Sequence, residues 1–89
     1  MKCIIELSLY PLHAEYETIV LEFIEKLKSD DLSIEVNNMS TQVSGELHIA
    51  FPIVQSALEF VWQKFGQASL VIKAIKYPEN PYLDEVAEK

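Results

Sequence analysis

The sequence is short of glycine, cysteine and basic residues, and each shortage excludes a class of function. Its 89 residues include only two glycines, too few for the glycine-rich phosphate loop of a P-loop or Rossmann protein. The single cysteine, Cys3, allows neither an internal disulfide nor a thiolate metal cluster within one chain. Seven basic residues against fourteen acidic ones give a net charge of −7. This balance argues against nucleic acid and anionic membranes as partners.

Long apolar runs are also absent, although the chain is apolar enough to form a core. No run approaches the roughly 20 residues that a membrane span requires. The N-terminus has one lysine before Glu6, which does not fit a signal peptide. The hydrophobic content of 49% indicates one folded domain. A domain of this length buries only about 60–65% of its unfolded surface, so a partner subunit would help its stability. We therefore expect a small cytoplasmic protein.

The spacing of the apolar residues predicts six secondary-structure elements. Alternating apolar residues predict strands over residues 2–9, 32–38, 41–48 and 69–76. Three- and four-residue spacing predicts helices over residues 14–28 and 51–65. Pro52 suits the first turn of the second helix and Gly66 suits its exit. The short connection that contains Asn38 predicts a hairpin between the second and third strands.

The element order βαββαβ, with right-handed crossovers, predicts a ferredoxin-like sandwich of the α+β class. Its four-stranded antiparallel sheet has the order 4-1-3-2, and two helices cover one face. This domain covers residues 1–76, and residues 77–89 form an acidic C-terminal tail.

The sheet face away from the helices is predicted to be polar and mainly acidic. Its residues are Glu6, Ser8, Glu35, Asn37, Gln42, Ser44, Glu46, His48 and Lys73. A solvated face is the ordinary explanation for such a surface in an antiparallel sheet. A ligand wall and a polar subunit interface are the alternatives.

Evidence for catalysis in the sequence is weak. Glu6 and Glu46 lie on strands predicted to be neighbours, and a carboxylate pair can perform acid–base chemistry. No third group completes a nucleophilic relay, however. His13 and His48 are not spaced as metal ligands. We therefore expect no catalytic residue, no metal and no cofactor.

Two short motifs support a family resemblance. Residues 6–12 (ELSLYPL) resemble the opening segment of the thiamine-binding YkoF-like domains, and residues 39–46 (MSTQVSGE) resemble their second signature. The resemblance covers residues 2–76. It implies non-catalytic binding of thiamine or its hydroxymethylpyrimidine portion, in thiamine transport or salvage. It also implies a homodimer or homotetramer assembled through sheet faces or edges.

The resemblance and the polar pattern together indicate eight ligand-binding residues. They are Glu6, Ser8, Tyr10, Asn38, Met39, Ser40, Thr41 and Glu46. An aminopyrimidine needs polar groups at its edge and an aromatic or apolar face, and these side chains offer both. A thiazolium cation would favour the carboxylates, whereas a diphosphate would find no basic cluster.

Two alternatives remain open at this level. The second motif could serve the fold, with Gly45 allowing a bulge or a close contact. The protein could also be a structural or regulatory module that oligomerises through its sheet and binds no small molecule.

Overall fold

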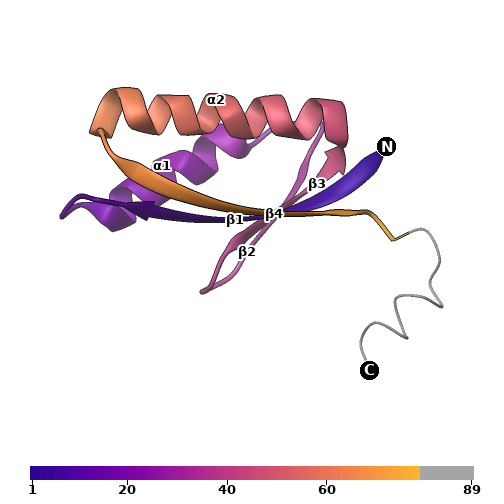
Figure 1. The fold of residues 1–89 in the computed structure, drawn as a ribbon, viewed down its shortest axis with the longest axis horizontal. Coiled ribbons are helices and arrows are strands. Elements are labelled where there is room, and N and C mark those ends of the chain that lie inside the picture. Colours follow the sequence, from indigo (N-terminus) through magenta and orange to yellow (C-terminus); the bar gives the residue numbers. More distant parts are fainter. Residues whose placement is uncertain (79–89) are drawn as a thin grey trace.

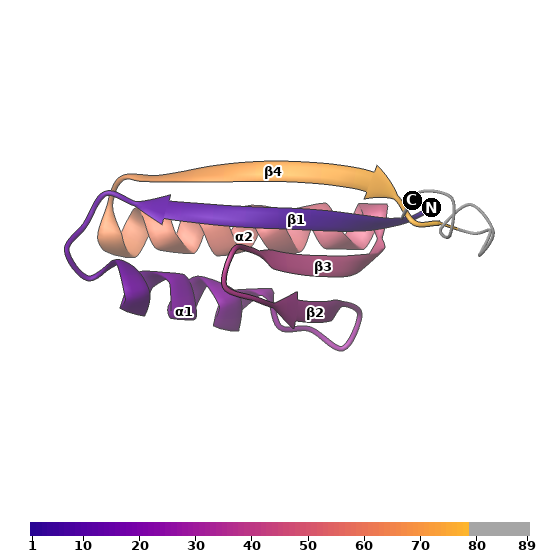
Figure 2. The same cartoon turned by 90° about the horizontal axis from the view of Figure 1, so that it is seen from below.

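The computed structural model describes residues 1–78 and contains two helices and four strands. In chain order the elements are β1 (Lys2–Pro11), α1 (Tyr16–Leu27), β2 (Ser33–Val36), β3 (Thr41–Glu46), α2 (Leu47–Phe65) and β4 (Ala68–Lys76). The strands form one sheet in the order β2-β3-β1-β4, and all neighbours are antiparallel. Both helices cover the same sheet face, and the other face is open (Figures 1 and 2).

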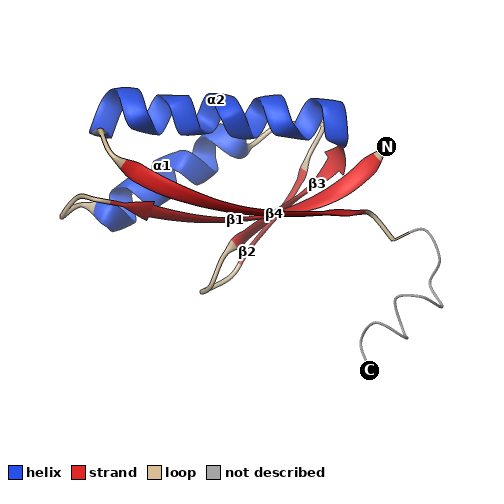
Figure 3. Ribbon diagram, in the orientation of Figure 1, coloured by secondary structure: helices blue, strands red, loops and turns tan. Residues whose placement is uncertain are grey.

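The predicted ferredoxin-like sandwich and its strand order are thus confirmed. Figure 3 shows the two layers, helices above and strands below. The predicted acidic tail over residues 77–89 falls, from residue 79 onward, outside the described residues.

The core lies between the helices and the central strands. Alternation along β1 buries Cys3, Ile5 and Leu7 on the helix side, as the sequence pattern predicted. The helices bury Ile19, Phe23, Leu27, Ala50, Val54, Ala57 and Val61 against them. Burying one of the valine, leucine, isoleucine or phenylalanine side chains of this core stabilises the fold by about 1.5–3 kcal/mol.

Gly45 allows a close backbone approach at the far end of β3. A β-carbon at this position would lie 2.7 Å from Leu32 Cδ2 and 2.9 Å from the carbonyl oxygen of Asp31. The chain leading into β2 therefore packs on β3 only because residue 45 has no side chain. The glycine of the second motif thus has a structural role, as the close-contact alternative predicted.

The junction between β3 and α2 differs from the prediction. The strand expected to reach His48 ends at Glu46, and α2 begins at Leu47 instead of residue 51. The backbone N–H of Leu47 donates a hydrogen bond of 2.8 Å to the Met1 carbonyl, which fixes the start of α2 beside the start of β1. Pro52 consequently lies inside the helix, where its missing N–H leaves one turn without a bond.

Smaller boundary differences have local causes. β1 runs two residues beyond the predicted end, because Tyr10 and Pro11 still pair with β4 in register. Pro11 is the last residue of the strand, so its missing N–H interrupts no further pairing. Gly66 lies directly after α2 with φ 92°, a left-handed conformation that favours glycine, so its predicted place at the helix exit is confirmed.

Candidate functional site

The β2–β3 connection is a tight loop organised by the side chain of Asn37. Its Oδ1 accepts hydrogen bonds from the backbone N–H groups of Met39 (2.8 Å) and Ser40 (3.0 Å). The backbone N–H of Asn37 donates in turn to the Ser40 carbonyl at 3.0 Å. Side-chain acceptance of this kind is typical of asparagine in turns. The second motif is therefore presented on an ordered loop.

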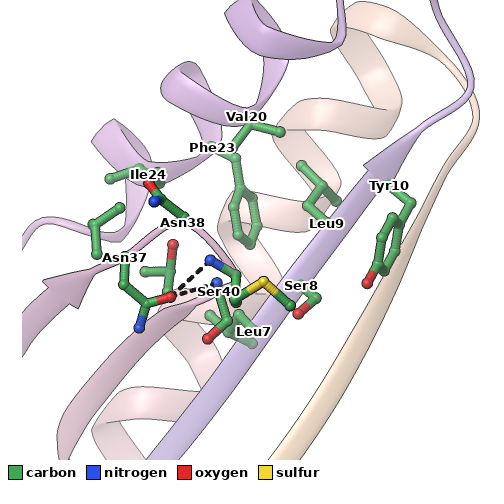
Figure 4. Close-up of a pocket in the computed structure, with 13 residues that line it drawn as sticks. Leu7, Ser8, Leu9, Tyr10, Val20, Phe23, Ile24, Asn37, Asn38 and Ser40 are labelled. Atoms are coloured by element: carbon green, nitrogen blue, oxygen red, sulfur yellow. Dashed lines mark hydrogen bonds between the residues drawn. The ribbon is translucent and has the colours of Figure 1, made fainter.

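This loop faces the end of β1 and one side of α1, and the three segments enclose a cavity of about 250 Å³. Residues 7–10 of β1 form one wall, and residues 36–41 form the opposite one. Val20, Phe23 and Ile24 contribute the α1 side. Figure 4 shows Phe23 and Leu9 beside the hairpin loop, with Tyr10 further along β1. Because β1 and β3 are neighbours, with Leu7 opposite Thr41, the two sequence motifs meet at this cavity.

The cavity has an apolar interior and a polar rim. Leu7 and Phe23 are fully buried and form the base of the apolar wall, and the partly buried Leu9, Val20 and Ile24 complete it. Tyr10 (56% exposed) and Met39 (85% exposed) stand at the opening. Hydroxyl and carboxamide groups complete the lining, which among the described residues includes no charged side chain. Such a lining suits a flat, neutral ring that carries polar groups on its edge.

The structure brings most of the predicted ligand-binding residues together. Those that line the cavity are Ser8, Tyr10, Asn38, Met39, Ser40 and Thr41. Glu6 lies on the open sheet face behind the rim, where its Oε2 accepts hydrogen bonds from Ser40 Oγ (3.1 Å) and Gln42 Nε2 (3.5 Å). Glu6 therefore reaches the cavity through Ser40.

Glu46 lies elsewhere, and the predicted approach of Glu6 to Glu46 is wrong. The strand register pairs Glu6 with Gln42 and Lys2 with Glu46. Glu46 therefore lies four positions along β3 from Gln42, the residue opposite Glu6, which is about 13 Å along the strand. Glu46 does not line the cavity.

Glu46 instead forms an ion pair with the N-terminal ammonium of Met1 at 3.0 Å. The hydrogen bond from this ammonium, followed by its charge, lowers the pKa of the Glu46 carboxyl. Both groups are substantially exposed to solvent, so the pair is screened.

Several residues of the site were not predicted from the sequence. Asn37 was expected on the polar sheet face, but it organises the loop. Val20, Phe23 and Ile24 lie in the predicted first helix, and they also form part of the cavity wall. Gln42 was not singled out, although it donates to Glu6. An asparagine followed by a short polar loop is a signal that could have identified Asn37.

Residues 1–78 contain no cluster of three or more histidine, cysteine, aspartate or glutamate side chains placed to hold a metal. None of the helices in this part of the chain combines the length and apolar composition of a membrane span.

Comparison with known proteins identifies the class. The chain belongs to the family described as thiamine-binding protein, whose sequence model matches residues 5–88. The family resemblance drawn from the two motifs is thus confirmed. No curated protein matches the sequence significantly.

Solved structures share the fold over nearly the whole chain. A hypothetical protein from Methanocaldococcus jannaschii has a TM-score of 0.80 at 24% identity, covering 99% of this chain and 98% of its own. A protein from Streptococcus pneumoniae has a TM-score of 0.79 at 25% identity, covering all of both chains. A protein from Thermotoga maritima, whose name suggests thiamine biosynthesis or salvage, has a TM-score of 0.77 at 18% identity, covering 99% of this chain and 98% of its own.

Proposed function

We propose that this protein binds thiamine, or its hydroxymethylpyrimidine portion, in the cavity between β1, α1 and the β2–β3 loop. The observation that carries the proposal is the convergence of both motifs of a thiamine-binding family on one cavity. The proposed contacts are the six predicted residues that line it, with Glu6 acting through Ser40.

The size and lining of the cavity favour the pyrimidine ring as the buried part of the ligand. Its volume of about 250 Å³ lies just below the roughly 300–1,000 Å³ found for ligand pockets. One ring fits such a volume better than the whole two-ring molecule. The partly buried side chains of Leu9, Val20 and Ile24 offer apolar surface. Asn38 and Ser40 offer hydrogen-bonding groups at the edge. The thiazolium ring would then lie at the opening, near Tyr10.

The same lining supports binding without chemistry. The cavity wall contains no histidine, cysteine, lysine or carboxylate among the described residues, so it offers neither an imidazole or amine base nor a thiol nucleophile. The Glu6 carboxylate touches this wall only through its hydrogen bond with Ser40. A diphosphate group would also meet no basic side chain in this wall. Free thiamine and hydroxymethylpyrimidine are therefore the proposed ligands.

The proposed setting is the cytoplasm, with a role in thiamine transport or salvage. Cys3 is a free, buried thiol, which is compatible with a reducing compartment. The salvage role suggested by the name of the Thermotoga maritima protein is extended to this chain as part of the proposal.

We also propose assembly into a homodimer or homotetramer through the sheet. β4 is an edge strand of nine residues, and within residues 1–78 it pairs with β1 alone, so no other described strand covers its outer edge. On the open face β4 exposes Val71 (47%) and Ile75 (59%).

Sedimentation tests the proposed assembly. Val71→Lys and Ile75→Lys are each expected to lower the association constant that it measures. A monomer at high concentration in the unaltered protein would refute this part of the proposal.

Calorimetric titration tests the binding proposal. Thiamine and hydroxymethylpyrimidine are expected to bind, and thiamine diphosphate to bind more weakly. The variant Val20→Trp places a large ring in the cavity from α1 and is expected to weaken thiamine binding at least about tenfold. Leu21→Trp is the matched control, because its neighbouring side chain is exposed and outside the cavity.

Two outcomes would contradict the proposal. The absence of both binding heat and a thermal shift at millimolar thiamine or hydroxymethylpyrimidine would exclude binding. Unchanged affinity in a folded Val20→Trp variant would exclude this cavity as the site.

A further inference from the structure

The hydrogen bond between Ser40 and Glu6 has a fixed direction. Ser40 Oγ lies 3.1 Å from Glu6 Oε2. A carboxylate can only accept, whereas a serine hydroxyl has one proton to donate and lone pairs to accept with. The single proton of Ser40 is therefore directed at Glu6 and not into the cavity.

The surroundings of Glu6 support this arrangement. Gln42 lies opposite Glu6 on β3, and its Nε2 donates to the same Oε2 at 3.5 Å. Both Glu6 and Ser40 are half-buried, so water competes less for this hydrogen bond than it would at an exposed pair.

Ser40 is also one of the residues that line the cavity. Because Glu6 takes its only hydroxyl proton, Ser40 Oγ can offer a ligand acceptor capacity only. The Asn37 Oδ1 atom nearby already accepts two backbone N–H groups, as the dashed lines in Figure 4 show. Ser8 and Tyr10 carry hydroxyls that can rotate and either donate or accept. Of the three hydroxyl groups of Ser8, Tyr10 and Ser40, that of Ser40 is held as an acceptor toward the ligand, because a second residue, Glu6, takes its proton.

We propose that the Glu6–Ser40 pair makes the cavity select a ring that donates a hydrogen bond over a ring that presents an acceptor at the same place. In chemical terms, the site prefers an amino-substituted pyrimidine to its oxo counterpart. This inference rests on the proposed function, because it concerns how the same cavity recognises its ligand. Glu6 is a positioning residue here, and Ser40 is the specificity-determining contact.

Thiamine and oxythiamine provide the test, because oxythiamine carries a carbonyl oxygen in place of the pyrimidine amino group. If this carbonyl oxygen faced Ser40 Oγ, two acceptor oxygens would meet with no proton between them. Calorimetric titration of the unaltered protein is therefore expected to give an affinity for thiamine at least about tenfold higher than for oxythiamine.

Two variants locate the origin of the preference. In Glu6→Gln the new amide can donate to Ser40 Oγ, which allows the Ser40 proton to turn toward the ligand. The preference is then expected to fall to within about threefold. Ser40→Ala removes the acceptor itself and is expected to reduce the preference similarly, even if Glu6→Gln fails to fold. Glu35→Gln is the matched control, since Glu35 also lies opposite Gln42 but outside the cavity, and it should keep the full preference.

The outcomes separate this inference from the proposed function. Tight binding of thiamine and oxythiamine with equal affinity would overturn the inference and leave the proposed function standing. Binding of neither compound would overturn the proposed function and the inference with it. Retention of the full preference in folded Glu6→Gln and Ser40→Ala variants would show that these residues do not determine it.

Discussion

The Oδ1 atom of Asn37 lies 3.0 Å from the backbone nitrogen of Ser40 and accepts its hydrogen bond. The same oxygen accepts from Met39 at 2.8 Å, so one side chain fixes the backbone of two residues on the cavity wall. The geometry of the wall therefore depends on the residue that directly follows β2.

Substitution of Asn37 should separate loop order from ligand contact. Asn37→Leu removes the acceptor and is expected to destabilise the fold by about 1 kcal/mol and to weaken thiamine binding severalfold. Asn37→Asp keeps an oxygen in the same place and should retain most of the affinity. Urea unfolding and calorimetry measure the two effects. Loss of affinity in Asn37→Asp as large as in Asn37→Leu would instead indicate direct contact through the amide NH₂ group.

Gly45→Ala should destabilise the protein by about 1–3 kcal/mol, because the new methyl group overpacks the contact between β3 and the chain before β2. The methyl would lie 2.9 Å from the Asp31 carbonyl oxygen, and backbone atoms cannot move aside as a flexible side chain can. Urea unfolding of Gly45→Ala against the neighbouring Ser44→Ala measures this cost. Equal stability of the two variants would mean that the loop before β2 relaxes freely.

Much of the fold could be predicted because burial follows simple periods. Cys3, Ile5 and Leu7 alternate as a strand buried on one face must, and the apolar residues of α1 recur at helical spacing. The convergence of the two motifs also followed from topology, since strands 1 and 3 are neighbours in this fold.

The register of β1 against β3 could not be predicted in the same way. A shift by an even number of residues leaves every side chain on its original face. Alternation therefore does not distinguish the observed register, in which Glu6 pairs with Gln42, from one that brings Glu6 to Glu46. The start of α2 could not be predicted from a local pattern either. The Leu47 N–H donates a hydrogen bond to the carbonyl of Met1, which is far away in the sequence.

The ion pair between Met1 and Glu46 predicts a small pH dependence of stability. The pKa of Glu46 is lowered in the folded protein, so the carboxylate stabilises the fold above its unfolded pKa, and this contribution is lost as the pH falls through the folded pKa. NMR titration should place this pKa below that of a free glutamate. Glu46→Gln should lose the contribution and, because the residue is outside the cavity, keep the affinity for thiamine. Weakened binding in this variant would instead place Glu46 in the site.

Phe23 connects the stability of the core to the shape of the cavity. Its ring is 2% exposed, packs in the core and also lines the cavity. Phe23→Ala is expected to cost about 3–5 kcal/mol, a large part of the stability of a domain this small, and to enlarge the cavity. Tyr16→Ala, on an exposed residue of the same helix, should change the unfolding free energy by less than about 0.5 kcal/mol. Urea unfolding monitored by circular dichroism compares the two. If Phe23→Ala remains folded, its affinity for thiamine should fall because the apolar wall is lost, and an unchanged affinity would show that the ring does not contact the ligand.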